Sequence, residues 1–179
     1  LDLAVESGLW GVFVGFESLN YEVFNAGSVC KSKKKLFQVY ERNVSRLKEK
    51  GVMVLGAFIF GLEGDSIESI DSTIEWAIKN RIDFAQFSVL TPLPGTKLFE
   101  RFKKEGRLLS TNWADFDMCR CVHEPQPPFT RDALNKSTEY AYRKFHGSLL
   151  SIVRGIKGTR FANILYQVVV NIYFGRFKI

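Results

Sequence analysis

The apolar residues of this chain fall into short runs that alternate with stretches of helical spacing. Three runs rich in β-branched and aromatic residues predict buried strands, at residues 10–16, 51–60 and 84–90. Between them, apolar positions three and four residues apart predict amphipathic helices at residues 36–47 and 67–78. Strand, turn and helix therefore repeat at roughly forty-residue intervals, which is typical of βαβ units and a parallel sheet.

The chain becomes less regular after the third predicted strand. Three apolar residues at helical spacing between residues 98 and 102 predict a short helix. A proline-containing connection follows, and we expect a short strand at residues 119–122 within it. A long helix is then predicted to begin after Thr130, and its apolar stripe consists of Leu134, Ala141, Phe145, Leu149 and Ile152.

Polar residues and glycines follow each predicted strand, as Glu17-Ser18, as residues 61–65 and as residues 91–96. Ligands of α/β folds gather at the carboxyl ends of the strands, so we expect these clusters to line one rim. Gly61 and Gly64 are suited to positive φ angles in a tight turn. Asp65 is expected either to begin the next helix, in a capping box with Glu68, or to hold a ligand hydroxyl.

The composition is that of an ordinary globular protein, with 46% apolar and 25% charged residues and a net charge of +6. The basic residues at 31–35 suit an anionic ligand or a membrane surface, although a solvated face is the commoner explanation. Three cysteines and no secretory leader favour a reducing, cytoplasmic setting. Residues 161–175 carry no charge but are short for a membrane span, which leaves docking on another protein segment or peripheral membrane contact.

Three motifs resemble the last strand ends of a radical S-adenosylmethionine (radical SAM) barrel. They are Val14-Gly15-Phe16-Glu17-Ser18, Phe58-Ile59-Phe60-Gly61-Leu62-Glu63-Gly64-Asp65-Ser66 and Phe87-Ser88-Val89-Leu90-Thr91-Pro92-Leu93-Pro94-Gly95-Thr96. The combination is most similar to the branch that carries a cobalamin-binding domain before the radical SAM core. Residues 140–145, with Trp113, also resemble the helical region that follows the core in that branch.

The resemblance implies an α/β fold: the C-terminal part of a partial TIM-type (βα) barrel with three parallel strands, followed by an α-helical C-terminal region. Residues 1–109 would form the barrel portion, 110–129 the irregular connection and 130–179 the helical region. The family's four-iron four-sulfur (4Fe-4S) cluster sits on a CxxxCxxC loop, which this sequence lacks, and Cys119-Arg120-Cys121 has the wrong spacing. The cluster ligands and any cobalamin domain are therefore expected upstream of Leu1, and no metal ligand is assigned here.

The resemblance also assigns roles to the rim. Glu17 and Ser18 resemble the polar pair that contacts the SAM ribose or its methionine end, with turn and cap residues as the alternative. The strand at Ile59 and Gly61 resembles the adenine face, and Asp65 matches an acid that either binds or caps. Glu63 replaces a proline that is common in relatives. The backbone at the adenine edge would be that of Leu90, Thr91 and Pro92, whereas residues 94–96 are expected to fix the turn and cap the helix.

The implied activity is reductive cleavage of SAM to a 5′-deoxyadenosyl radical, followed by cobalamin-dependent methylation or a related modification. The substrate would be an unknown small molecule or lipid, and this fragment alone would be inactive. One alternative is an RNA-modifying radical SAM enzyme, although no basic β-rich module is present and no nucleic-acid partner is expected. Others are a non-catalytic module that docks on a membrane or partner, and a phosphate-binding barrel, which the proline-rich 91–96 turn disfavours. His123 and His146 are expected to be structural or surface residues.

Overall fold

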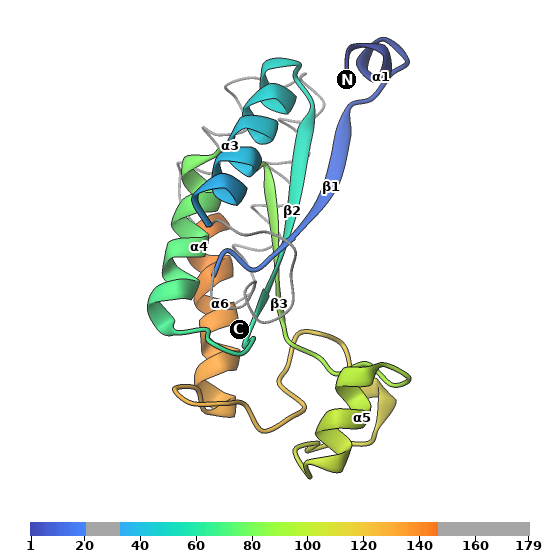
Figure 1. Ribbon diagram of the computed structural model, residues 1–179, viewed down its shortest axis with the longest axis vertical. Helices are drawn as coiled ribbons and strands as arrows, with labels where there is room; N and C mark the ends of the chain where they lie inside the picture. Colours follow the sequence, from blue (N-terminus) through green and yellow to red (C-terminus); the bar gives the residue numbers. More distant parts are fainter. Residues whose placement is uncertain (21–32, 147–179) are drawn as a thin grey trace.

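The computed structural model describes residues 1–20 and 33–146, and its parallel sheet carries helices on one face (Figure 1). The strands are β1 (Gly11–Glu17), β2 (Met53–Phe60) and β3 (Phe84–Val89). The predicted α/β fold with three parallel strands is confirmed. The helices are α1 (Asp2–Glu6), α3 (Lys33–Glu49), α4 (Ile67–Lys79), α5 (Lys97–Lys104) and α6 (Arg131–His146), with a 3-10 turn, η1, at Trp113–Asp115.

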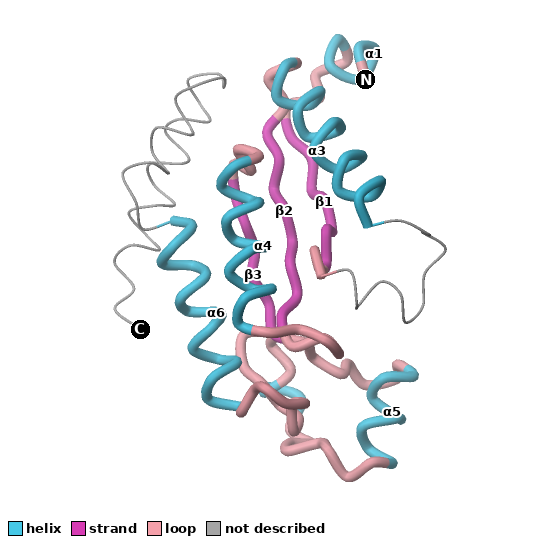
Figure 2. The backbone as a smooth tube through the Cα atoms, turned by 60° about the vertical axis from the view of Figure 1, so that its left-hand side comes forward, coloured by secondary structure: helices cyan, strands magenta, loops and turns pink. Residues whose placement is uncertain are grey.

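The strands lie in the order β1-β2-β3, and both pairs are parallel. Leu55 of β2 is in register with Phe13 of β1 and Phe84 of β3. Two residues further along, Ala57 is in register with Gly15 and Gln86. Successive side chains of a strand point to opposite faces, so these two rows share one face. Helices α3, α4 and α6 lie over the other face (Figure 2).

Phenylalanine rings fill the centre of the helix-covered face. Phe16, Phe58 and Phe87 come from the three strands in turn, and neighbouring rings stack with centroids 5.5 and 5.6 Å apart. Gly56 makes room for them, because a Cβ there would lie 3.1 Å from the rings of Phe16 and Phe58. Truncating a buried phenylalanine to alanine typically costs about 3–5 kcal/mol. This row therefore holds the three strands in alignment just below their carboxyl ends.

Helix α6 covers the outer edge of β3 with side chains. Tyr142 Oη accepts a hydrogen bond from Phe87 N at 3.0 Å, and His146 Nε2 lies 3.2 Å from Ala85 O. Val89 N, the next amide along this edge, donates a hydrogen bond at 2.8 Å to Met118 O in the loop before α6. Since these backbone groups are occupied, the edge of β3 is protected from pairing with a further strand.

A buried ion pair joins three elements at the amino ends of the strands. Lys48 Nζ, near the end of α3, lies 2.6 Å from each carboxylate oxygen of Asp83, which precedes β3. Asp83 Oδ2 also accepts a hydrogen bond from Val54 N of β2 at 2.7 Å. The Asp83 side chain is 1% exposed, so this contact fixes the end of the sheet opposite the rim.

The segment between β3 and α6 lies beyond the carboxyl ends of the strands, where α5 stands away from the sheet (Figure 1). The strand predicted at residues 119–122 is wrong, because these residues form no strand, and the neighbouring His123 makes an isolated antiparallel bridge with Leu108. Side chains satisfy the amides of this segment instead: Asp117 accepts from the Cys119 amide, and Asn135 accepts from the Cys121 amide.

Two predictions fall outside the described residues, namely the apolar segment 161–175 and the continuation of the long helix to Leu149 and Ile152. Within residues 1–20 and 33–146, no helix has both the length and the apolar character needed to cross a membrane.

Candidate functional site

The carboxyl ends of the three strands lie side by side at one edge of the sheet (Figures 1 and 2). Two hydrogen bonds join them. Asn20 Nδ2 donates to Gly64 O at 2.5 Å, which ties the loop after β1 to the turn after β2. Leu90 N donates to Phe60 O at 2.8 Å, which ties the end of β3 to β2. We call this edge, formed by residues 17–20, 61–65 and 90–92, the rim.

Glu17 ends β1 in a backbone conformation that side-chain-bearing residues rarely adopt, with φ at 59°. The register of β1 against β2 shifts at the same point, between Gly15 and Glu17. The exposed carboxylate lies back along the strand, because a Cβ placed on Gly15 would overlap Glu17 Oε1. Bulges and strained residues often re-aim a side chain beside a ligand site. Ligand contact by Glu17 stays a prediction.

Ser18 and Asn20 shape the turn that follows Glu17. Ser18 is 4% exposed, and its Oγ accepts a hydrogen bond from Asn20 N at 2.9 Å. The sequence did not predict a role for Asn20, whose Nδ2 reaches Gly64 O and also lies 3.4 Å from Asp65 Oδ1. These partners are distant in sequence, so no local pattern indicates the contact. Ligand contact by Ser18 stays a prediction.

Asp65 organises the turn after β2. Its Oδ2 accepts hydrogen bonds from Gly61 N and Leu62 N, each at 3.0 Å, and Ser69 Oγ donates to Oδ1 at 3.3 Å. Burial raises the pKa of the Asp65 carboxyl above its usual range, and these hydrogen bonds oppose the rise. The carboxylate is thus engaged with the protein on both oxygens. Its direct contact with a ligand stays a prediction.

The start of α4 differs from the prediction. The capping box of Asp65 and Glu68 is wrong, because Ser66 is the N-cap and exchanges hydrogen bonds with Ser69. Aspartate and serine are both favoured N-cap residues. Here the Asp65 carboxylate is drawn to the amides of the preceding turn, which leaves the next residue to cap the helix. The predicted cap of α5 is confirmed, since Thr96 Oγ1 accepts from the third amide after it at 3.2 Å.

Gly61 and Gly64 both have the predicted positive φ, at 91° and 88°. A Cβ on Gly61 would lie 2.7 Å from Leu134 Cδ2, so this glycine lets α6 approach the end of β2. Ile59, two residues earlier, is half-buried and in register with Ser88. The structure therefore assigns a packing function to Gly61, and the ligand contacts predicted for Ile59 and Gly61 stay predictions.

The rim segment after β3 has some of its polar groups already engaged. Leu90 N donates a hydrogen bond to Phe60 O, and Thr91 Oγ1 donates one to Val89 O at 3.0 Å. Pro92 is buried. The Leu90 amide is therefore not available to read an adenine ring. Contacts from the other groups of Leu90, Thr91 and Pro92 stay predictions.

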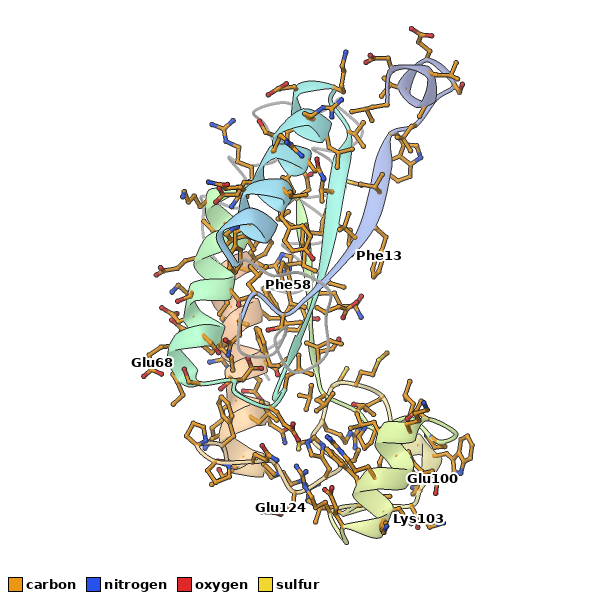
Figure 3. All side chains as sticks on the ribbon, viewed as in Figure 1. Phe13, Phe58, Glu68, Glu100, Lys103 and Glu124 are labelled. Atoms are coloured by element: carbon orange, nitrogen blue, oxygen red, sulfur yellow. The ribbon has the colours of Figure 1, made fainter. Side chains whose placement is uncertain are left out.

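The face of the sheet opposite the helices is open around Phe13, Gly15 and Gln86. Figure 3 shows Phe58 directed toward the helices and Phe13 directed away from them, and Phe13 is 65% exposed. In a TIM-type barrel the helices lie outside, so the uncovered face is the wall of the interior. Gly15 and Gln86 of this face are exposed, Gly11, Leu55, Ala57 and Ile59 are half-buried, and Met53, Phe84 and Ser88 are buried.

Other chemically active side chains near the rim are engaged elsewhere. Glu63 Oε1 lies 3.2 Å from Arg101 Nη2 and 3.3 Å from Gln126 Nε2, which connects the rim to α5 and the following loop.

Cys119 is exposed whereas Cys121 is buried. Among the residues the structure describes, no three histidines, cysteines or acids are grouped to hold a metal ion.

The two histidines lie in packed surroundings, as predicted. His123 is fully buried, with Nδ1 3.7 Å from Cys121 Sγ and its ring beside that of Phe102. Burial lowers the pKa of His123 to about 4, so the ring is neutral at physiological pH. His146 is 6% exposed and lies against Tyr142 and Phe145. Both histidines therefore contribute to packing.

Comparison with known proteins finds methyltransferases among the relatives of this chain, although no protein-family model matches. Bacteriochlorophyllide d C-12(1)-methyltransferase of Chlorobaculum tepidum is 38% identical over 125 residues, which cover 70% of this chain and 26% of that protein. Bacteriochlorophyllide d C-8(2)-methyltransferase of the same organism is 26% identical over 121 residues, covering 66% and 26%. The chain thus spans about a quarter of the length of the curated relatives it matches.

A solved structure matches nearly the whole chain. It is the radical S-adenosylmethionine methyltransferase TsrM from Kitasatospora setae, with cobalamin and an iron–sulfur cluster bound. The match covers 97% of this chain and 41% of that one, with a TM-score of 0.55 and 15% sequence identity. At this identity the likeness concerns the fold.

The parallel sheet and its single helical layer match part of an α/β barrel, a fold in which ligands bind at the carboxyl ends of the strands. The chain is similar in sequence to curated methyltransferases, and its fold is that of the corresponding part of a radical SAM methyltransferase.

Proposed function

We propose that the full protein containing this chain is a radical SAM methyltransferase, and that this chain forms the ribose and adenine wall of its SAM pocket. The observation that carries the proposal is the strained, exposed Glu17 at the bulge ending β1. A carboxylate can accept hydrogen bonds from both ribose hydroxyls. The relatives named as methyltransferases support this assignment.

The remaining rim residues would position the nucleoside. Ser18 and Asn20 hold the turn that presents Glu17, and the Asp65 network keeps the turn after β2 in place. Ala57 and Ile59 offer an apolar surface on the open face, against which a flat base can pack. The chain would thus bind and orient SAM and exclude water from the reacting centre.

The cofactors would be held outside this chain. Cys119 and Cys121 do not fit an iron–sulfur site, because one is exposed, the other is buried, and their spacing differs from a cluster loop. When bound, the 4Fe-4S cluster would supply the electron that cleaves SAM to a 5′-deoxyadenosyl radical. We include cobalamin in the proposal because the TsrM structure contains it and covers nearly all of this chain.

The substrate would be a bulky, mainly apolar organic molecule rather than a macromolecule. Both relatives described above are named for methylating a bacteriochlorophyllide, which is a tetrapyrrole. The open face below the rim is apolar, with Phe13 65% exposed and Leu55 half-buried in the same row. An apolar wall of this kind suits such a molecule. We propose methyl transfer to carbon as the reaction.

The proposal is tested with the full-length protein, reconstituted with iron and sulfide under anaerobic conditions. Given a reductant and SAM, the wild type should release 5′-deoxyadenosine, measured by mass spectrometry, and Glu17→Gln should reduce the yield about tenfold or more at limiting SAM. Absorption bands of an iron–sulfur cluster and of a corrinoid should accompany the activity. A reconstituted protein that neither binds nor cleaves SAM would overturn the proposal.

A further inference from the structure

Gln86 is a polar side chain on an otherwise apolar part of the open face. It lies in the middle of β3, is exposed, and is in register with Ala57 and, through it, with Gly15. The row before it contributes Phe13, Leu55 and the buried Phe84 to the same face. The row after it contributes Ile59 and Ser88, which is only 9% exposed. A strand that lines a packed, apolar barrel interior does not need an exposed carboxamide here.

The row that contains Gln86 has a polar group at each end and small residues between them. At the β1 end, the Glu17 carboxylate lies over Gly15. Ala57 presents only a methyl group in the middle. Adjacent strands are about 4.8 Å apart, so Gly15 and Gln86 are separated by about 10 Å across the sheet. This span is comparable to a nucleoside measured from its ribose hydroxyls to the far edge of its base.

The chemistry of the carboxamide matches the edge of adenine. A glutamine side chain both donates and accepts, and adenine presents an amino donor beside ring-nitrogen acceptors. Leu90 N was one of the groups expected at the adenine edge, but it donates its hydrogen bond to Phe60 O. Gln86 lies on β3, further from the rim than Leu90. A base that packs on Ala57 and Ile59 would direct its edge toward this part of β3.

We infer that Gln86 is a base-reading residue, which binds the adenine edge of SAM through its carboxamide while Glu17 binds the ribose. The inference rests on the proposed function and adds the residue that binds the amino edge of the adenine. The occupant of this part of the open face is then the nucleoside, rather than side chains from elsewhere in the full protein.

The test measures dissociation constants of the full-length protein for S-adenosylhomocysteine and for its purine-riboside analogue, which carries hydrogen in place of the adenine amino group. The wild type should prefer the adenine compound by about tenfold or more, since a mismatched base leaves buried hydrogen-bonding groups unpaired. Gln86→Leu keeps the side-chain volume and should reduce this preference to near unity. Gln38→Leu, at an exposed glutamine of α3, is the matched control and should preserve the preference.

The outcomes separate this inference from the proposed function. Failure of the wild type to bind S-adenosylhomocysteine would overturn both. Normal binding that Glu17→Gln weakens, combined with an unchanged base preference in Gln86→Leu, would overturn only the role of Gln86. Equal binding of the two compounds by the wild type would also overturn it, whatever the folding of the variant.

Discussion

At the scale of single residues, His123 is a buried group whose protonation is coupled to folding. Its pKa is about 4 in the folded protein, against 6.5 for an ordinary histidine. Between these values the unfolded chain binds a proton that the folded chain does not. Free energy of unfolding is therefore lost as the pH falls from 6.5 toward 4.

The expected loss attributable to His123 is about 2 kcal/mol by pH 5, since each unit of pKa difference corresponds to about 1.4 kcal/mol. Urea unfolding of the full-length protein at pH 7.5 and pH 5 measures it, with His123→Leu as the comparison. The leucine variant should lose correspondingly less stability between the two pH values. An identical pH dependence in both proteins would show that His123 titrates normally in the folded state.

At the scale of elements, the Lys48–Asp83 pair joins α3 to the amino ends of β2 and β3. Removing one partner of a buried ion pair leaves a desolvated charge, which typically costs about 3–5 kcal/mol. Lys48→Met should therefore lower the free energy of unfolding by an amount in this range. Affinity for S-adenosylhomocysteine below the melting transition should be retained, because the pair lies at the end of the sheet opposite the rim.

The matched control is Lys79→Met, because Lys79 is 78% exposed and lies 3.9 Å from Glu41. An exposed pair of this kind contributes about 0–1 kcal/mol. Equilibrium unfolding in urea compares the two variants. If Lys48→Met and Lys79→Met proved equally mild, the buried pair would not be the contact that fixes the amino end of the sheet.

The elements themselves were largely predictable, because apolar periodicity and glycine placement are local signals. Gly61 and Gly64 were expected at positive φ and are found there. The error at α4 arose because Asp65 and Ser66 are both good cap residues, and the choice between them depends on the Gly61 turn. The strand predicted at residues 119–122 failed because side chains satisfy its amides.

The parts of the site that sequence did not predict depend on contacts between distant segments. Asn20 bonds to Gly64, 44 residues away. Gln86 was not distinguished because strands of a parallel sheet are apolar on both faces, so alternation does not reveal which face the helices cover. Glu17, by contrast, was found through its motif, and the structure adds its bulge and its left-handed backbone.

At the scale of the whole molecule, the chain is one wall of a larger barrel. Helices cover one face of the sheet, α6 closes the edge of β3, and the other face is open below the rim. The three strand tips converge at a single edge, with Glu17 directed over the open face. This convergence would allow residues from three separate motifs to bind one nucleoside, as proposed above.

The most direct measurement of this claim is the dissociation constant of the full-length protein for S-adenosylhomocysteine, determined for the wild type, Glu17→Gln and Glu63→Gln. Glu63 is a second carboxylate of the rim, but it faces Arg101 and Gln126. Loss of the Glu17 charge should weaken binding by about tenfold or more, on the order of 1.4 kcal/mol, whereas the Glu63 variant should bind like the wild type. Unchanged affinity in Glu17→Gln would contradict the account.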